Sequence, residues 1–365
     1  MRRLSSYRDF DWILLGFVLI LSVISVLEIK SATLMTKFRG FDHKQIGFLL
    51  VGLLLMFLIS MVDYHRLIDI APWAYGIGVV SLVAVKLVGQ KVLGARRWIR
   101  IGSFHFQPSE WIKLILIVAV ARYFWGLAGK ELSWQDIGKV FAMVCIPMGL
   151  VLIQPDLGTS LTYLPILLCG LLLGGLRLRQ AGILILGFAL LGGAVFASGK
   201  RLKPYQQARI NAFLDPDSDP KGSGYQIRQS LIAVGSGGIW GQGANKGTQT
   251  QGDFLPIPYT DFIFAAFAEE HGFVGAVGVL LLYFLILMRL IQNAQTASDL
   301  PGAFIIMGVV AVIIFQIAVN VGMVVGLMPV TGIPLPLMSY GGSSILFTFL
   351  ALGIVMNIRM RRFVN

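Results

Sequence analysis

The sequence predicts an all-α integral membrane protein of about ten transmembrane helices with one large extracytoplasmic loop. Of its 365 residues, 56% are hydrophobic and 13% are charged, and the mean hydropathy of +0.78 exceeds that of soluble globular domains. The apolar runs do not alternate as the strands of a membrane barrel do. No polar stretch longer than roughly 60 residues separates them, so we treat residues 1–365 as a single membrane domain.

Each apolar run approaches the roughly 17–25 residues that a helix needs to cross a bilayer. The first run follows a short basic N-terminus and is longer than the apolar core of a cleaved signal peptide, so we expect it to be retained. The expected spans are 12–33, 45–61, 67–89, 109–127, 137–153, 158–175, 180–198, 272–292, 302–325 and 342–358.

The even number of spans places both termini on one side of the membrane. Both ends are basic, with Arg2, Arg3 and Arg8 at the start and Arg359, Arg361 and Arg362 at the end. The positive-inside rule then predicts a multi-pass protein of the cell inner (plasma) membrane with cytoplasmic termini.

Many cations nevertheless fall in the outward connections, where that rule expects few. The chain carries 30 Lys and Arg against 18 Asp and Glu, and this balance suggests membrane lipids or an anionic substrate as partners. The basic residues are dispersed between apolar spans, which argues against nucleic acid. The outward cations are Lys91, Arg96, Arg97, Arg100, Lys200, Arg201, Lys203, Arg209, Lys221, Arg228 and Lys246.

The cysteine and histidine residues show no spacing typical of a zinc or iron–sulfur site. Cys145 and Cys169 lie inside apolar runs and are expected to behave as small hydrophobes. No residue is assigned as a metal ligand, although carboxylates that bind a divalent cation such as Mg²⁺ or Mn²⁺ stay possible.

The long outward loop, about 199–258, is expected to be structured. Ile227, Leu231 and Ile232 have helical spacing, and glycine clusters follow at 235–238 and 241–243. This pattern indicates a short interfacial helix followed by turns.

Charged residues inside or beside spans are costly and need partners or water. Glu110 and Lys113 share one helix face and can form an ion pair, either as a helix clamp or with Lys113 holding an anionic substrate group. Glu269 and Glu270 must face a cavity or pair with cations.

Two aspartates stand at the outer ends of spans. Asp156, in the turn 154–160, could cap the next helix. Asp261 precedes an apolar run, where partial desolvation suits a general base and where helix capping is the alternative. The last outward loop, 328–344, is rich in Pro and Gly and is expected to be preshaped.

Four segments together resemble the SEDS family (shape, elongation, division and sporulation). They are Phe106–Glu110, Gln154–Ser160, Leu214 through Gly238 and Thr260–Ala265. The stretch Gly247–Pro256 is similar to the elongation branch of that family more than to its division branch. Ile257, Pro258 and Tyr259 depart from the family pattern, which has a charged or polar residue before Thr260.

The resemblance implies a peptidoglycan glycosyltransferase that polymerises lipid II into a growing glycan strand during cell elongation, with undecaprenyl pyrophosphate leaving by inverting single displacement. Asp261 matches the family's catalytic aspartate. The substrate-binding candidates are Arg97, Glu110, Lys113, Asp156, Arg209 and Lys246, facing the periplasm or exterior. Charge-assisted contacts from the cations would stabilise the pyrophosphate.

The resemblance also implies a class B penicillin-binding protein transpeptidase as partner, docked on spans eight and nine, together with the elongation machinery. Three alternatives stay open: a lipid II flippase or transporter, a non-catalytic scaffold, and the division-specific branch of the family. A transporter should carry ionisable groups near the bilayer midplane, whereas the polar clusters here lie at the outer ends of spans.

Overall fold

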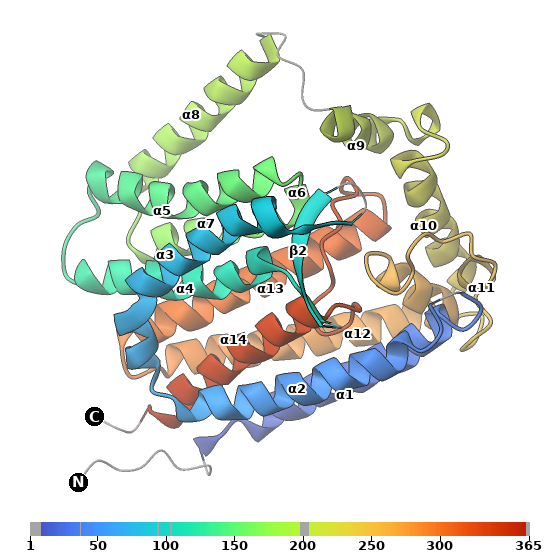
Figure 1. Ribbon diagram of the computed structural model, residues 1–365, viewed down its shortest axis with the longest axis horizontal. Coiled ribbons are helices and arrows are strands. Elements are labelled where there is room, and N and C mark those ends of the chain that lie inside the picture. The colour runs from blue at the N-terminus through green and yellow to red at the C-terminus, as the bar shows by residue number, and fades with distance from the viewer. Residues whose placement is uncertain (1–8, 37, 93–94, 103, 198–203, 363–365) are drawn as a thin grey trace.

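The computed structural model describes residues 9–36, 38–92, 95–102, 104–197 and 204–362, and Lys200, Arg201 and Lys203 lie outside this part. Figure 1 shows most of the long helices lying roughly parallel, with the marked N- and C-termini at the same end. The apolar helices are α1 (Trp12–Ala32), α2 (Phe41–Met61), α3 (Tyr64–Val88), α4 (Pro108–Gly126), α5 (Trp134–Ile153), α6 (Leu157–Leu161), α7 (Leu164–Leu173), α8 (Leu178–Ala197), α12 (Ile263–Gln295), α13 (Leu300–Val324) and α14 (Gly342–Met360).

Seven helices of the described residues are long and apolar enough to cross a membrane. They are α1, α2, α3, α5, α12, α13 and α14. The expected span 158–175 is divided into α6 and α7, with Pro165 in the first turn of α7, where proline is tolerated. The expected span 109–127 corresponds to α4, which carries Glu110, Lys113 and Arg122. The chain is therefore a helical integral membrane protein.

The last helix is the most enclosed of these spans. In the 18-residue apolar stretch of α14, 83% of the residues are buried, against 56% in the corresponding stretch of α13. Gly52 of α2 lies under the ring of Phe349, and Gly353 of α14 lies against the backbone of Met56, so that a methyl group at either glycine would clash. The two helices therefore pack at a distance that only glycine allows.

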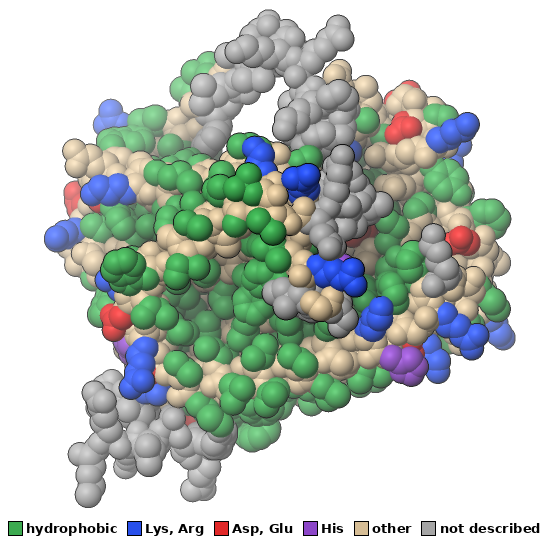
Figure 2. Space-filling view, in the orientation of Figure 1, with side chains coloured by type: hydrophobic (Ala, Val, Ile, Leu, Met, Phe, Trp, Pro, Cys, Tyr) green, Lys and Arg blue, Asp and Glu red, His purple; other side chains and the backbone are tan. Residues whose placement is uncertain are grey.

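The outer surface of the bundle is apolar. Figure 2 shows hydrophobic side chains across much of one face, with Lys and Arg at its two ends and also in its central part. Large side chains exposed on α3 include Trp73, Ile77 and Val80. Such a belt is the surface that lipid would cover.

A small antiparallel sheet precedes α4, and the sequence analysis did not predict it. Its strands are β1 (Gln90–Val92), β2 (Ala95–Ile101) and β3 (Phe104–Phe106), in the order β1-β2-β3. β2 brings Arg97 over the turn that contains Asp156, because the Arg97 side chain donates to the backbone oxygens of Gln154 and Pro155.

The region between α8 and α12 contains more secondary structure than the single short helix expected there. It forms α9 (Pro204–Leu214), a 3₁₀ turn (Pro216–Ser218), α10 (Ser223–Gly237) and α11 (Thr248–Gln251). On α10, Ile227 is buried while Leu231 and Ile232 are partly exposed. α10 packs against α12 and α13, so this region lies against the membrane helices.

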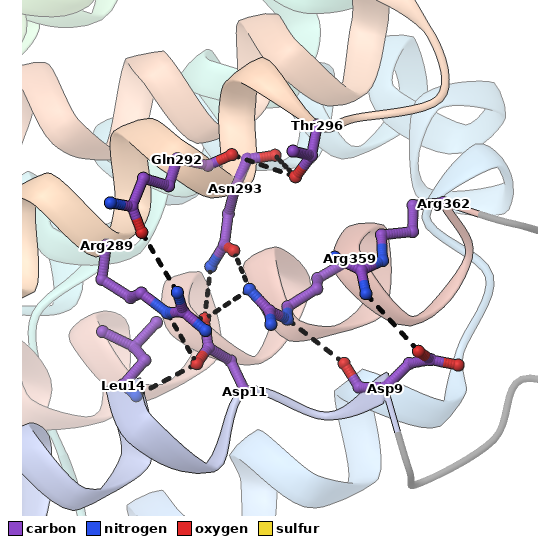
Figure 3. A network of polar contacts seen from close by, with 9 residues as sticks. All are labelled: Asp9, Asp11, Leu14, Arg289, Gln292, Asn293, Thr296, Arg359 and Arg362. Carbon is purple, nitrogen blue, oxygen red and sulfur yellow. Dashed lines mark hydrogen bonds and ion pairs between the residues drawn. The ribbon is translucent and has the colours of Figure 1, made fainter.

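A polar network joins the first and last helices at the end where the termini lie (Figure 3). The carboxylate of Asp11, 1% exposed, accepts from Arg289, Asn293 and Arg359. It also caps α1 through the backbone N–H of Leu14. Asn293 lies in the last turns of α12, whereas Asp261 precedes the first, so this network and Asp261 lie at opposite ends of that helix.

Candidate active site

Asp261 lies in a tight turn directly before α12. The N-cap of α12 is Phe262, and no side-chain cap bond is formed there. Neighbouring segments fix the backbone of the turn: Asn320 of α13 donates to the oxygen of Asp261 at 2.9 Å, and the Ser339 hydroxyl donates to the oxygen of Thr260 at 2.7 Å. The half-buried carboxylate is therefore held by the backbone rather than by a capping role.

The Pro- and Gly-rich segment between α13 and α14, residues 328–341, packs against this turn, and we call it the floor of the site. Asn320 donates a second bond to the oxygen of Ile333 at 2.8 Å, and Tyr283 donates to the oxygen of Pro336 at 2.5 Å. Gly332 has a φ of +73°, and a methyl group there would lie 3.4 Å from Oδ2 of Asp261. That contact leaves room for a methyl group, so the positive φ, which side chains other than glycine rarely adopt, explains why glycine occupies the position.

Tyr259, where the sequence departs from the family pattern, has an aromatic environment. Its ring lies 5.0 Å from that of Phe38, 5.4 Å from that of Phe41 and 6.0 Å from that of Tyr340. Tyr340 also donates its backbone N–H to the oxygen of Tyr259. Tyr259 therefore anchors the turn by packing.

The turn containing Asp156 lies on the other side of the floor. Asp156 caps α6 by accepting from the N–H of Thr159 at 3.2 Å, as the capping interpretation predicts. Its second oxygen accepts from Gln107 at 3.1 Å, and Arg97 Nη1 lies 3.8 Å from Oδ1. A methyl group on Gly158 would touch the backbone oxygen of Thr331 at 2.6 Å, so this turn packs directly on the floor.

Arg209 of α9 reaches the same floor, donating to the oxygen of Thr331 at 3.1 Å. Burial raises the pKa of Asp261 from its ordinary value of 3.8 to about 6. The positive charges of Arg209 and Arg97 oppose this rise, and the negative charge of Asp156 adds to it. The structure thus brings together four of the candidate residues: Asp261, Asp156, Arg97 and Arg209.

Glu110 and Lys113 form a buried pair beside this cluster. Their side chains are joined at 2.8 Å, and Lys113 is 0% exposed with its ammonium 4.3 Å from the ring centre of Phe347. Tyr163 donates to the oxygen of Ser109 at 2.8 Å and so ties α4 to the Asp156 turn. An ammonium without exposed surface fits the helix clamp better than direct substrate contact.

Lys246 is not brought to this cluster. It is exposed in the loop between α10 and α11, and its backbone N–H donates to the oxygen of Gly243 in that same loop. Glu269 was expected to face a cavity or to pair with a cation, but protein hydrogen-bond donors satisfy it instead. Its carboxylate accepts from the backbone N–H groups of Gln249 and Thr250 at the start of α11, at 2.7 and 3.0 Å.

Chemically, the cluster combines one base with fixed positive charge. A carboxylate with a pKa near 6 is ionised at neutral pH and basic enough to accept a hydroxyl proton. The two guanidinium groups offer planar donor sets suited to phosphate oxygens. Asp261 and Asp156 belong to no group of three or more candidate metal ligands among the described residues.

These features define a helical membrane protein with a polar site at the ends of its helices, opposite the end where the termini lie. The chain belongs to the cell cycle protein family FtsW/RodA/SpoVE, whose profile matches residues 7–363. It is 38% identical to "Peptidoglycan glycosyltransferase MrdB" of Escherichia coli K12, covering 96% of this chain and 94% of that protein. It is 33% identical to "Peptidoglycan glycosyltransferase RodA" of Treponema pallidum, covering 99% and 100%.

A solved structure has the same fold. A chain from the work titled "Structural coordination of polymerization and crosslinking by a peptidoglycan synthase complex" superposes with a TM-score of 0.84 at 33% identity, covering 98% of this chain and 99% of that one.

Two residues that hold the site were not predicted from the sequence. Asn320 lies inside an expected span and is fully buried, and an amide in a membrane helix is a signal for such a role. Gln107, which positions Asp156, belongs to one of the four quoted segments but was given no role.

Proposed function

We propose that this chain is a peptidoglycan glycosyltransferase of the RodA type, which polymerises lipid II during cell elongation. The observation that carries the proposal is that Asp261, Arg97 and Arg209 gather on one segment. Gly332 lies beside Asp261, Arg209 donates to the oxygen of Thr331, and Arg97 holds the Asp156 turn that packs on Thr331. A base and a phosphate-binding charge therefore lie at one place. The membership of the FtsW/RodA/SpoVE family and the likeness to glycosyltransferases over the full length of the chain support it.

The reaction is a single displacement at the anomeric carbon. Asp261 accepts the proton of the acceptor hydroxyl. The oxygen of that hydroxyl forms the new glycosidic bond to the anomeric carbon. The bond from the carbon to the phosphate oxygen breaks, and undecaprenyl pyrophosphate leaves with inversion. A single displacement needs no carboxylate nucleophile, so one base is sufficient.

Arg97 and Arg209 bind the pyrophosphate as negative charge develops on it. Arg97 is pre-positioned by Gln154, Pro155 and Asp156, and Arg209 by Thr331. Fixed donors need little reorganisation during the reaction, which is the main advantage of such a site. The pair of Glu110 and Lys113 on α4 stabilises the helix that packs beside the Asp156 turn, and it does not contact the substrate.

We place this site on the extracytoplasmic side and both termini in the cytoplasm. Figure 3 shows Arg289, Arg359 and Arg362 gathered around Asp9 and Asp11. This network involves the last turns of α12, whereas Asp261 precedes the first turn of that helix. The positive-inside rule makes the end with this network cytoplasmic.

The partner is a class B penicillin-binding protein that docks on α12 and α13. The likeness to a chain of a peptidoglycan synthase complex supports a partner of this kind. On the outer face of α12, Phe273, Val277, Leu281 and Phe284 are exposed. Bulky substitution of Val277 should weaken co-purification of the transpeptidase, whereas the same change at Ile77 of α3, also exposed, should not.

A polymerisation assay tests the function. The purified chain, alone and with its transpeptidase, is given labelled lipid II in detergent, and glycan strands are separated on a gel. Strands longer than the substrate support the proposal. A chain that makes no polymer in either arm, yet moves lipid II across vesicle membranes, would be a flippase.

A further inference from the structure

Two buried carboxylates approach each other between α1 and α12, apart from the Asp261 cluster. Glu28 of α1 and Glu270 of α12 are each 1% exposed. Both carboxylate oxygens of Glu28 and one of Glu270 have no hydrogen-bond donor among the described residues. The other oxygen of Glu270 accepts from the Ser31 hydroxyl. Two such groups in an apolar bundle call for a positive partner.

His271 adds a nitrogen to this pair. Its Nδ1 lies 3.8 Å from Oε2 of Glu28, and one ligand atom from each of the three residues falls within 4.8 Å of the others. The ring is half-exposed and stacks on Phe267 with centroids 4.3 Å apart. In the described part of the chain, neither glutamate forms an ion pair with a lysine or arginine.

The neighbouring Glu269 shows that the lack of donors is local. Its carboxylate accepts two backbone N–H groups and the hydroxyl of Thr250 at 2.7 Å. Protein donors thus satisfy the carboxylate on one side of α12, whereas Glu28 has none. A bound cation would satisfy Glu28 in their place.

The three residues meet at a break in α12. Gly272 has a φ of +66°, and a methyl group there would lie 2.3 Å from the backbone nitrogen of Gly241. The loop after α10 takes over the hydrogen bonding of the broken turn, for example from the N–H of Gly243 to the oxygen of Glu270 at 2.9 Å. Glu270 and His271 are therefore the last residues of the short first half of α12, which directly follows Asp261.

We propose that Glu28, Glu270 and His271 bind one divalent transition-metal cation, which holds α1 against the broken start of α12. Two carboxylates and one imidazole are a mixed oxygen and nitrogen set, which suits Mn²⁺ or Zn²⁺ better than the all-oxygen preference of Mg²⁺ or Ca²⁺. Water can reach the half-exposed side of His271 and complete the coordination.

Metal binding to the full-length purified chain tests this without substrate, so the result is independent of the glycosyltransferase proposal. The chain is stripped with chelator and titrated with Mn²⁺, followed by electron paramagnetic resonance, or with Zn²⁺, followed by calorimetry. We expect about one ion per chain and a rise in the unfolding temperature. Glu28→Gln and His271→Gln should each weaken binding at least about tenfold and abolish the rise.

His43→Gln is the matched control. His43 has a largely exposed ring 3.9 Å from the buried carboxylate of Asp42, and it lies outside the Glu28, Glu270 and His271 group, so its loss should leave binding unchanged. Glu28→Gln removes one of two like charges, so in chelator it should unfold no earlier than the parent. If it does not fold, His271→Gln carries the test because that side chain is half-exposed. A parent chain that binds neither ion, or two glutamine variants that bind as the parent does, would overturn the proposal.

Discussion

The side-chain amide of Asn320 donates a hydrogen bond of 2.9 Å to the backbone oxygen of Asp261. A second bond from the same amide reaches Ile333 in the floor of the site. One buried side chain of α13 therefore fixes the turn that carries Asp261 relative to the segment beneath it.

Asn320→Leu should lower turnover by about tenfold or more, because Asp261 loses the hydrogen bond from Asn320 that orients its turn. Leaving two buried carbonyls without a donor should also cost about 1–3 kcal/mol of stability. Gln316→Leu is the control on the same helix, since the amide atoms of Gln316 are buried without hydrogen-bond partners among the described residues, and it should be neutral or stabilising. Equal activity in both variants would show that Asn320 has no positioning role.

The pH dependence of activity should follow the raised pKa of Asp261, about 6. The base works only when ionised, so turnover should fall as the pH drops through about 6. A pH profile of polymerisation, with lipid II saturating, measures this. An activity that stays flat down to pH 4.5 would mean that Asp261 is not the group that titrates.

The same shift has a consequence for stability with a definite sign. The folded-state pKa lies above the unfolded value, so ionised Asp261 destabilises the fold above pH 6, and this effect vanishes below about pH 4. Asp261→Asn should therefore unfold at a higher temperature than the parent at pH 7.5 and at the same temperature at pH 4. A variant that is less stable than the parent at pH 7.5 would contradict the burial of this carboxylate.

Lys113→Met should destabilise the protein by about 3–5 kcal/mol, because it leaves Glu110 buried and unpaired. The double variant Glu110→Gln, Lys113→Met should recover most of the stability and most of the activity. Breaking the exposed pair Arg177–Glu131 by Arg177→Met should change little. A double variant that is as stable as the parent but inactive would instead place Lys113 on the substrate.

Asp11→Ala should cost about 3–5 kcal/mol, because Arg289, Arg359 and Asn293 lose their shared acceptor at the end of α12 far from Asp261. Asp69→Ala, whose exposed carboxylate lies 3.8 Å from Arg122, is the comparison and should be nearly silent. Thermal unfolding in detergent measures both. If Asp11→Ala unfolds at about the same temperature as Asp69→Ala, the Asp11 network contributes nothing to stability.

The sequence predicts the membrane helices well because continuous apolar runs respond directly to the thickness of the bilayer. The division of span 158–175 into α6 and α7 was not predicted, since it depends on local geometry around Thr162 and Pro165. The sheet before α4 was missed for a different reason. Strands of three to seven residues have little pattern of their own, and tertiary contacts such as those of Arg97 hold them.

The candidate site could be predicted in part. Asp261, Asp156 and Arg97 stand out because charge beside a span is costly, but the sequence could not show that Arg209, from the long loop, joins them while Lys246 does not. The proximity of Glu28 to Glu270 could not be predicted from the sequence either. The two residues lie on helices far apart in sequence, and Glu28, inside the expected span 12–33, was given no role.

The central claim is that Asp261 is the general base of glycan polymerisation. The direct test compares Asp261→Asn with the parent and with Asp253→Asn, an exposed aspartate whose positive φ of 56° asparagine also tolerates. All three proteins, shown to be monodisperse, receive labelled lipid II together with the transpeptidase. We expect Asp253→Asn to polymerise at the parental rate and Asp261→Asn to lose roughly 100- to 10,000-fold. An Asp261→Asn protein that makes polymer at more than about a tenth of the parental rate would contradict the assignment.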